Sequence, residues 1–198
     1  PDGSEGMRRN LRTALTLLKQ AGWILQNGEL VKGDKKFEFE ILLVSADDEK
    51  VALEFARSLQ RLGITAHVRT VDSAQYQARL NEYGFDMTIN FWSSTLSPGN
   101  EQVYYWGSAA ADQPGSRNYA GVKDPVVDAL AGSIAKAQTR PELVARARAL
   151  DRVLMWGHYI IPLTYLGRDL VAYQAGLGKP ETTPVYGILP EQTWWRVQ

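Results

Sequence analysis

The residues best suited to bind a ligand are a tryptophan and the three hydroxyl side chains after it: Trp92, Ser93, Ser94 and Thr95. The tryptophan ends a stretch, 85–92, whose apolar residues alternate as in a β-strand, and the three hydroxyl residues follow it. Open α/β sheets bind ligands beyond the carboxyl ends of their strands. An indole has an apolar body and one N–H donor, which suits a half-wet surface. A role in sealing the edge of a core explains this tryptophan equally well.

Asn118 and Tyr119 are a second candidate pair, and Gly121 follows them closely. The pair offers an amide, a ring and a permissive backbone on one long loop. Turn chemistry alone also accounts for Asn and Gly in such a loop. Both interpretations stay open from the residues themselves.

Catalytic chemistry finds little support. The sequence has no phosphate-binding loop, dinucleotide fingerprint, zinc-protease helix or nucleophile elbow. Its two histidines, His67 and His158, fall in a predicted strand and near a predicted helix end, where a hydrogen-bonded structural role is favoured over a base. Asp47 and Asp48 favour a helix dipole at a helix start over acid–base work. We therefore expect no enzyme, no metal and no cofactor.

Composition narrows the class further. The chain has 198 residues, with 22 Lys and Arg against 22 Asp and Glu, so no net charge attracts nucleic acid. Cysteine is absent, which excludes disulfides and thiolate chemistry. Its apolar stretches are far shorter than the roughly 18 to 20 residues of a membrane span. Because it begins with Pro1 rather than Met and lacks a leader pattern, we expect a fragment of a longer protein.

Hydrophobic periodicity predicts an α/β architecture. A helix over 5–21 ends at Gly22, and Asn27–Gly28 predicts a tight hairpin between 23–25 and 29–31. Strands are expected at 37–43, 64–71 and 85–92, separated by helices at 51–62 and 73–81. Strands joined through helices pair in parallel, so the pattern predicts a β-α-β-α-β layer.

In the second half of the chain, the sequence predicts a loop, two helices and a tail. Residues 93–121, which surround a short aromatic stretch at 103–106, predict a long ordered loop with one helical turn. Asp124 with Pro125, and Thr139 with Glu142, predict the starts of two helices. The tail holds strand-like pieces at 160–166 and 170–173.

Several segments together resemble the carboxy-terminal part of family 5 extracellular solute-binding proteins, the oligopeptide and dipeptide receptors of ABC importers. The segments are LLKQAGW (17–23), FDMTINFW (85–92), SRNYAG (116–121), DPVVDAL (124–130), ALDRVL (149–154) and YIIPL (159–163). Their order and spacing match over nearly the whole chain. The sequence of these segments is most similar to the oligopeptide group that includes microcin C receptors.

This resemblance implies an α/β lobe of the type II periplasmic-binding-protein kind, mainly a parallel sheet flanked by helices. Residues 1–163 would form the carboxy-terminal ligand-binding lobe and 164–198 a crossover segment returning to a first lobe. A peptide or peptide-like ligand would be enclosed between the lobes and contacted by Trp92, Ser93, Ser94, Thr95, Asn118 and Tyr119. The full-length parent would be periplasmic or lipid-anchored and would deliver its ligand to ABC permease subunits.

The sequence departs from the family at one place. Many members carry an Asp two or three positions after this tryptophan, which pairs with the amino group of the peptide. Here Ser94 and Thr95 occupy those positions. Because a neutral hydroxyl cannot neutralise a buried ammonium, we expect an N-blocked ligand, or an amino group held elsewhere.

Two other classes remain as alternatives. A freestanding α/β interaction module would pair with a protein through Trp194, Trp195 and the 100–120 loop. A small transferase or hydrolase would need a nucleophile, base and orienting group that the sequence does not supply.

Overall fold

A computed structural model describes residues 6–92, 95, 97–163, 170–185 and 187–197. The chain divides into two compact units, residues 1–160 and 161–198, each with its own internal contacts. The sequence-based division at residue 163 concerns the lobes of a longer protein and stays a prediction. Each unit is described separately below.

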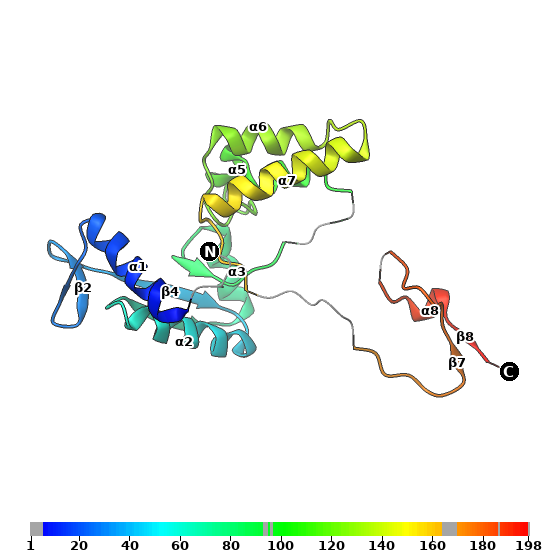
Figure 1. The fold of residues 1–198 in the computed structure, drawn as a ribbon, viewed down its shortest axis with the longest axis horizontal. Helices are drawn as coiled ribbons and strands as arrows, with labels where there is room; N and C mark the ends of the chain where they lie inside the picture. Colours follow the sequence, from blue (N-terminus) through cyan, green and yellow to red (C-terminus); the bar gives the residue numbers. More distant parts are fainter. Residues whose placement is uncertain (1–5, 93–94, 96, 164–169, 186, 198) are drawn as a thin grey trace. The chain divides into compact units, whose positions relative to one another are not determined.

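The first unit is a mixed α/β structure (Figure 1). Its elements are α1 (Met7–Gln20), β1 (Ile24–Gln26), β2 (Glu29–Lys32), β3 (Lys35–Lys36), β4 (Glu38–Leu43), α2 (Ala46–Gln60), β5 (Thr65–Thr70), α3 (Ser73–Asn81), β6 (Met87–Thr88), α4 (Glu101–Trp106), α5 (Ser108–Ala111), α6 (Pro125–Ile134) and α7 (Arg140–Trp156). In the part of the chain described, no helix is both long and apolar enough to cross a membrane.

The amino-terminal helix and hairpin are confirmed. Asn27 and Gly28 have φ of 52° and 84°, the left-handed pair that a two-residue turn of this kind requires, and Gln26 pairs with Glu29. A third short strand, β3, extends the hairpin into a three-stranded ribbon. Leu30 of the ribbon is buried with Leu62 and Ile64, so α1, the ribbon and the end of α2 share one small core.

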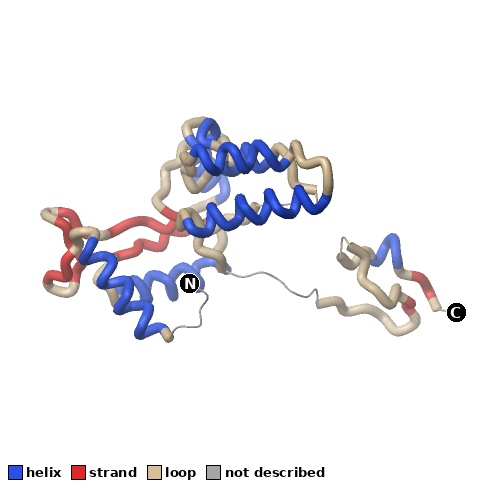
Figure 2. The backbone as a smooth tube through the Cα atoms, turned by 45° about the horizontal axis from the view of Figure 1, so that its top comes forward, coloured by secondary structure: helices blue, strands red, loops and turns tan. Residues whose placement is uncertain are grey.

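The predicted parallel sheet is also confirmed. Its strand order is β5-β4-β6, and both pairs are parallel, with α2 and α3 as the crossovers. Figure 2 shows these strands with the helices that connect them. Ile41 and Leu43 of the central strand are buried against Ala52 of α2, because that face of the sheet packs on the helix.

The third strand is much shorter than the sequence predicts. Alternation suggested 85–92, yet β6 spans Met87–Thr88 and pairs only through Ile41↔Met87 and Leu42↔Thr88. Ile89 still packs with Met87 on the sheet core, but Phe91, expected on the same face, is 80% exposed. Without further ladder bonds to β4, the backbone leaves the sheet and the period-two alternation ends.

In the helical half, the two predicted helix starts are confirmed, whereas the predicted loop differs from the structure. Asp124 accepts a hydrogen bond from the Val126 backbone N–H, and Thr139 accepts one from that of Glu142. The predicted single helical turn is instead two short helices, α4 and α5. Tyr105 and Trp106 of α4 are buried in a core shared with α6 and α7, which lie side by side in Figures 1 and 2.

The second unit contains little regular structure. Its elements are β7 (Leu177–Gly178), α8 (Pro190–Thr193) and β8 (Trp195–Arg196). The strands expected at 160–166 and 170–173 are absent among the residues described there, and 164–166 lie outside them. Strands need ladder partners, and the pairing described in this unit joins only β7 to β8.

Gly63 lies between α2 and β5 and packs closely against the ribbon. Replacing it tests this contact. Its φ is +80°, and an added Cβ would lie 2.6 Å from Leu25 Cδ1 and 2.9 Å from the Leu30 backbone nitrogen. We expect Gly63→Ala to lower the free energy of unfolding by about 2 kcal/mol or more, measured by urea denaturation.

Gly33→Ala is the matched control for this change. Gly33 also has a positive φ, +61°, but its added Cβ would meet nothing within 4 Å. It should therefore cost only the backbone strain, about 1 kcal/mol. Equal losses at the two positions would show that close packing at Gly63 is unimportant.

Candidate functional site

Trp92 lies where the chain passes from the sheet to the helical half. Its indole is half-buried and stacks on Trp106, with ring centroids 4.7 Å apart and planes tilted by 37°. The indole N–H donates to the backbone oxygen of Arg117 at 3.3 Å. The ring is therefore held at the edge of the helical core, with part of its surface free.

Beside this indole is a hollow of about 290 Å³, called here the Trp92 hollow. It is lined by Trp92, Thr95, Pro98, Gln102, Tyr105, Trp106, Ile134, Ala147, Leu150, Asp151, Leu154, Met155 and Ile160. The lining is mostly apolar with a few polar groups, the composition expected of a small-molecule site. Its volume is near the lower end for such sites.

Thr95 lies at this hollow, whereas Ser93 and Ser94 fall outside the described residues. The Thr95 hydroxyl donates to the Ser97 backbone oxygen at 3.0 Å and accepts from its N–H at 3.3 Å. This side chain therefore closes a local turn while remaining exposed to solvent.

Asn118 occupies a different position from the ligand-facing one expected from the sequence. Its side chain is completely buried. The amide nitrogen donates to the backbone oxygens of Gly107 and Val122 at 2.9 and 3.0 Å, and the amide oxygen accepts from the Val122 N–H at 2.9 Å. Asn118 thus braces the loop and could touch a ligand only if the loop opened.

Tyr119 is half-buried, next to Arg117. Side-chain hydrogen bonds, first with Tyr119 and then with Tyr105, hold the pKa of the Arg117 guanidinium above its ordinary value. The guanidinium carbon also lies 5.8 Å from the Tyr105 ring centroid, in cation–π geometry. Sequence reasoning missed Arg117, because nothing in its local pattern distinguishes it from a solvated arginine.

Tyr76 ties α3 to the end of β6. Its hydroxyl lies 2.9 Å from the Thr88 hydroxyl oxygen and donates to the Ile89 backbone oxygen at 3.2 Å. Burial raises the pKa of Tyr76, and the nearby Tyr119 raises it further.

The other titratable candidates take ordinary positions. His67 is exposed on β5, with its Nε2 3.8 Å from Glu38 Oε2, and His158 follows α7. Asp47 and Asp48 lie in the first turn of α2, as the dipole argument predicts. Within the described ranges, no three His, Cys, Asp or Glu side chains are grouped to hold a metal ion.

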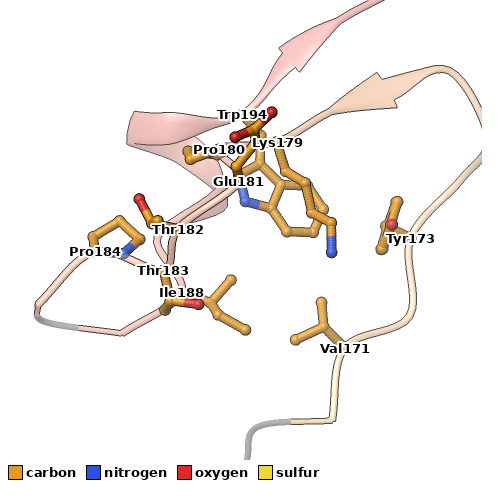
Figure 3. A pocket seen from close by; sticks show the side chains of 10 residues that line it. All are labelled: Val171, Tyr173, Lys179, Pro180, Glu181, Thr182, Thr183, Pro184, Ile188 and Trp194. Atoms are coloured by element: carbon orange, nitrogen blue, oxygen red, sulfur yellow. The ribbon is translucent and has the colours of Figure 1, made fainter.

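A second hollow, of about 430 Å³, belongs to the unit 161–198 (Figure 3). Tyr173 and Trp194 meet edge to face there, 4.8 Å apart, and Lys179 Nζ lies 5.5 Å from the Tyr173 centroid. Although it is larger, none of the described residues of this unit is buried, so no packed core fixes its walls. The Trp92 hollow, built on a packed core, is the better candidate site.

Comparison with known proteins agrees with the fold. The profile of the bacterial extracellular solute-binding proteins, family 5 Middle, matches residues 1–114, which is more than half of the chain. The chain belongs to family 5 of these proteins. The matched residues include Trp92 and Thr95.

Two family 5 relatives from Agrobacterium fabrum are similar along the whole chain. The “Probable peptide-binding protein YejA” is 44% identical and the “Peptidoglycan-binding protein YepA” 40% identical, over 95% and 100% of this chain. The chain spans only 31% and 32% of their lengths.

Solved structures confirm the predicted fold class. The oligopeptide-binding protein AppA from Bacillus subtilis, in complex with a nonapeptide, aligns over 72% of this chain and 29% of its own, at TM-score 0.65 and 23% identity. A periplasmic oligopeptide-binding protein from Thermotoga maritima, bound to mannohexaose, aligns over 85% and 33%, at TM-score 0.69 and 20% identity. The chain therefore has the α/β fold of periplasmic binding proteins.

Replacing Asn118 tests its bracing role. Asn118→Ala removes three buried hydrogen bonds to backbone groups and leaves those groups unpaired. We expect the free energy of unfolding to fall by about 2 to 4 kcal/mol, measured by urea denaturation.

The control is Asn100→Ala, at an exposed asparagine whose side chain makes no cap hydrogen bond to α4. It should change stability by less than about 0.5 kcal/mol. A similarly small effect at Asn118 would contradict the bracing role.

Proposed function

We propose that this chain is part of the substrate-binding receptor of an ABC importer, its carboxy-terminal lobe. The receptor encloses an oligopeptide or peptide-like ligand between two lobes and delivers it to the membrane permease. One observation carries the proposal: a chain of family 5 holds a half-exposed tryptophan at the carboxyl edge of its parallel sheet, beside an apolar hollow.

The lengths of the relatives support a two-lobed parent. This chain spans about a third of each, so most of the second wall of the pocket comes from other residues. Residues 164–198 are proposed to cross back to that other lobe. The described residues of the unit 161–198 include none that is buried, which suits a segment that packs against another part of the protein.

The ligand class follows from the surface and the relatives. Trp92 presents an aromatic face, and Thr95, Gln102 and Asp151 add polar groups, a mixture that suits backbone and side chains of a peptide. Relatives named for binding peptides and peptidoglycan support peptide-like ligands. Ser93, Ser94 and Tyr119 complete the proposed contact set. In the cell this receptor would be periplasmic or lipid-anchored.

Closure supplies the affinity in this mechanism. A ligand that touches both lobes stabilises the closed state over the open one by its extra contacts. The helical core behind Trp92 holds one wall in place while the lobes move about their connecting segments.

The resemblance and the structure together predict the state of the ligand's amino terminus. The positions of the family's ammonium-binding Asp hold Ser94 and Thr95 here, and the Thr95 hydroxyl is engaged with the Ser97 backbone. We expect the full-length receptor to bind an N-formylated peptide about tenfold or more tightly than the same peptide with a free amine, measured by calorimetry.

Thr95→Asp provides the matched variant, because a carboxylate there should shift preference toward the free amine. Tighter binding of the free amine by the unmodified receptor would contradict the prediction.

A single lobe should not bind alone. Residues 1–198 hold the open Trp92 hollow without a facing lobe and cannot close around a peptide, so we expect no measurable binding at micromolar concentrations by calorimetry. Micromolar affinity of this chain by itself would show that the second lobe is dispensable.

A further inference from the structure

We propose that Arg117 is an anion-recognition residue at the rim of the Trp92 hollow, where it pairs with a carboxylate of the bound ligand. This inference rests on the proposed function and goes further, because it assigns charge selectivity to one residue.

The position of Arg117 ties it to two walls of the hollow. Its backbone oxygen accepts the hydrogen bond from the Trp92 indole, and its guanidinium carbon lies 5.8 Å from the Tyr105 ring centroid. Trp92 and Tyr105 both line the hollow. Arg117 is not itself a lining residue, but these two contacts place it next to residues that are.

The guanidinium is held in place before any ligand arrives. Its guanidinium carbon lies 5.8 Å from the Tyr105 ring centroid in cation–π geometry, and the neighbouring Tyr119 and Tyr105 keep the pKa of the guanidinium above its ordinary value. An exposed arginine normally loses much rotamer freedom when it binds an anion. Here neighbouring rings have already restricted the side chain, so less entropy is lost on binding.

Donors remain available for an anion. A guanidinium carries five N–H donors in a planar fork, and two phenol oxygens cannot occupy all of them. Two N–H donors of this fork match the two oxygens of a carboxylate. The ammonium group of a lysine has no such fork. The arrangement thus suits a carboxylate better than a neutral amide.

Its charge is not neutralised within the described residues. Arg57, Arg69, Arg79 and Arg146 each pair with a glutamate, whereas no described carboxylate forms an ion pair with Arg117. Asp151 lines the same hollow from α7 but makes no ion pair with it. An accessible cation that has no described ion pair and contacts residues lining the hollow points to an anionic group on the ligand.

The test uses the full-length receptor and ten synthetic probes. N-acetylated, C-amidated Ala-Ser-Ala-Ser-Ala peptides carry one Glu at each position in turn, and a second set carries Gln instead. By calorimetry, we expect Glu to bind about tenfold or more tightly than Gln at one position at least. Arg117→Met should remove this preference and leave the affinity for the Gln peptides within about twofold.

Two further variants separate recognition from folding. The Trp92 hydrogen bond uses the Arg117 backbone oxygen, so it survives either substitution. Arg117→Lys keeps the charge without the fork and should give an intermediate preference. Arg148→Met, at an exposed arginine of α7, removes the same charge elsewhere and should leave the preference unchanged.

The outcomes distinguish this inference from the proposed function. Equal binding of Glu and Gln peptides at all positions, or a preference that survives Arg117→Met, overturns the inference while peptide binding supports the receptor. A folded receptor that binds none of the ten peptides overturns the proposed function, and this inference with it.

Discussion

The early end of β6 decides where the candidate site lies. Only two residues of this strand pair with β4, after which the chain turns away from the sheet. The end is secured by Thr88, whose hydroxyl donates to the Leu42 backbone oxygen at 2.9 Å and meets the Tyr76 hydroxyl. Were the ladder longer, Trp92 would lie in the sheet. Instead it reaches the helical core and packs on Trp106.

The second requirement is a loop that behaves as a rigid wall. Asn118 achieves this from within, because its buried amide replaces the regular backbone bonds that an irregular segment lacks. The Ser116 hydroxyl, also buried, donates to the Ala110 backbone oxygen and accepts from the Asn118 N–H. Arg117 and Tyr119, on either side of this buried amide, are held outside it as a consequence. Polar residues with similar sequence signals therefore have two different roles here. Some hold the loop together from inside, and others lie on its outer side.

The positions of individual charged side chains matter more in this protein than its net charge. Equal numbers of acidic and basic residues leave no net field for steering a ligand. All four arginines with described ion pairs are bound to glutamates, as Arg146 is to Glu142. Recognition of a charged ligand group would therefore depend on a single ordered side chain at short range, where geometry matters more than net charge.

Local signals in the sequence determined the elements whose causes are local. The Asn27–Gly28 turn, the Asp124 and Thr139 caps and the crossover order of the parallel sheet all follow from nearby residues. Trp92 was recognised because it follows an alternating stretch. Tertiary structure alone decided how far β6 extends, since a strand continues only while a neighbour offers ladder bonds. It also decided that Asn118 is buried and Arg117 exposed, because these depend on how the loop folds around the Asn118 amide and packs on the helical core.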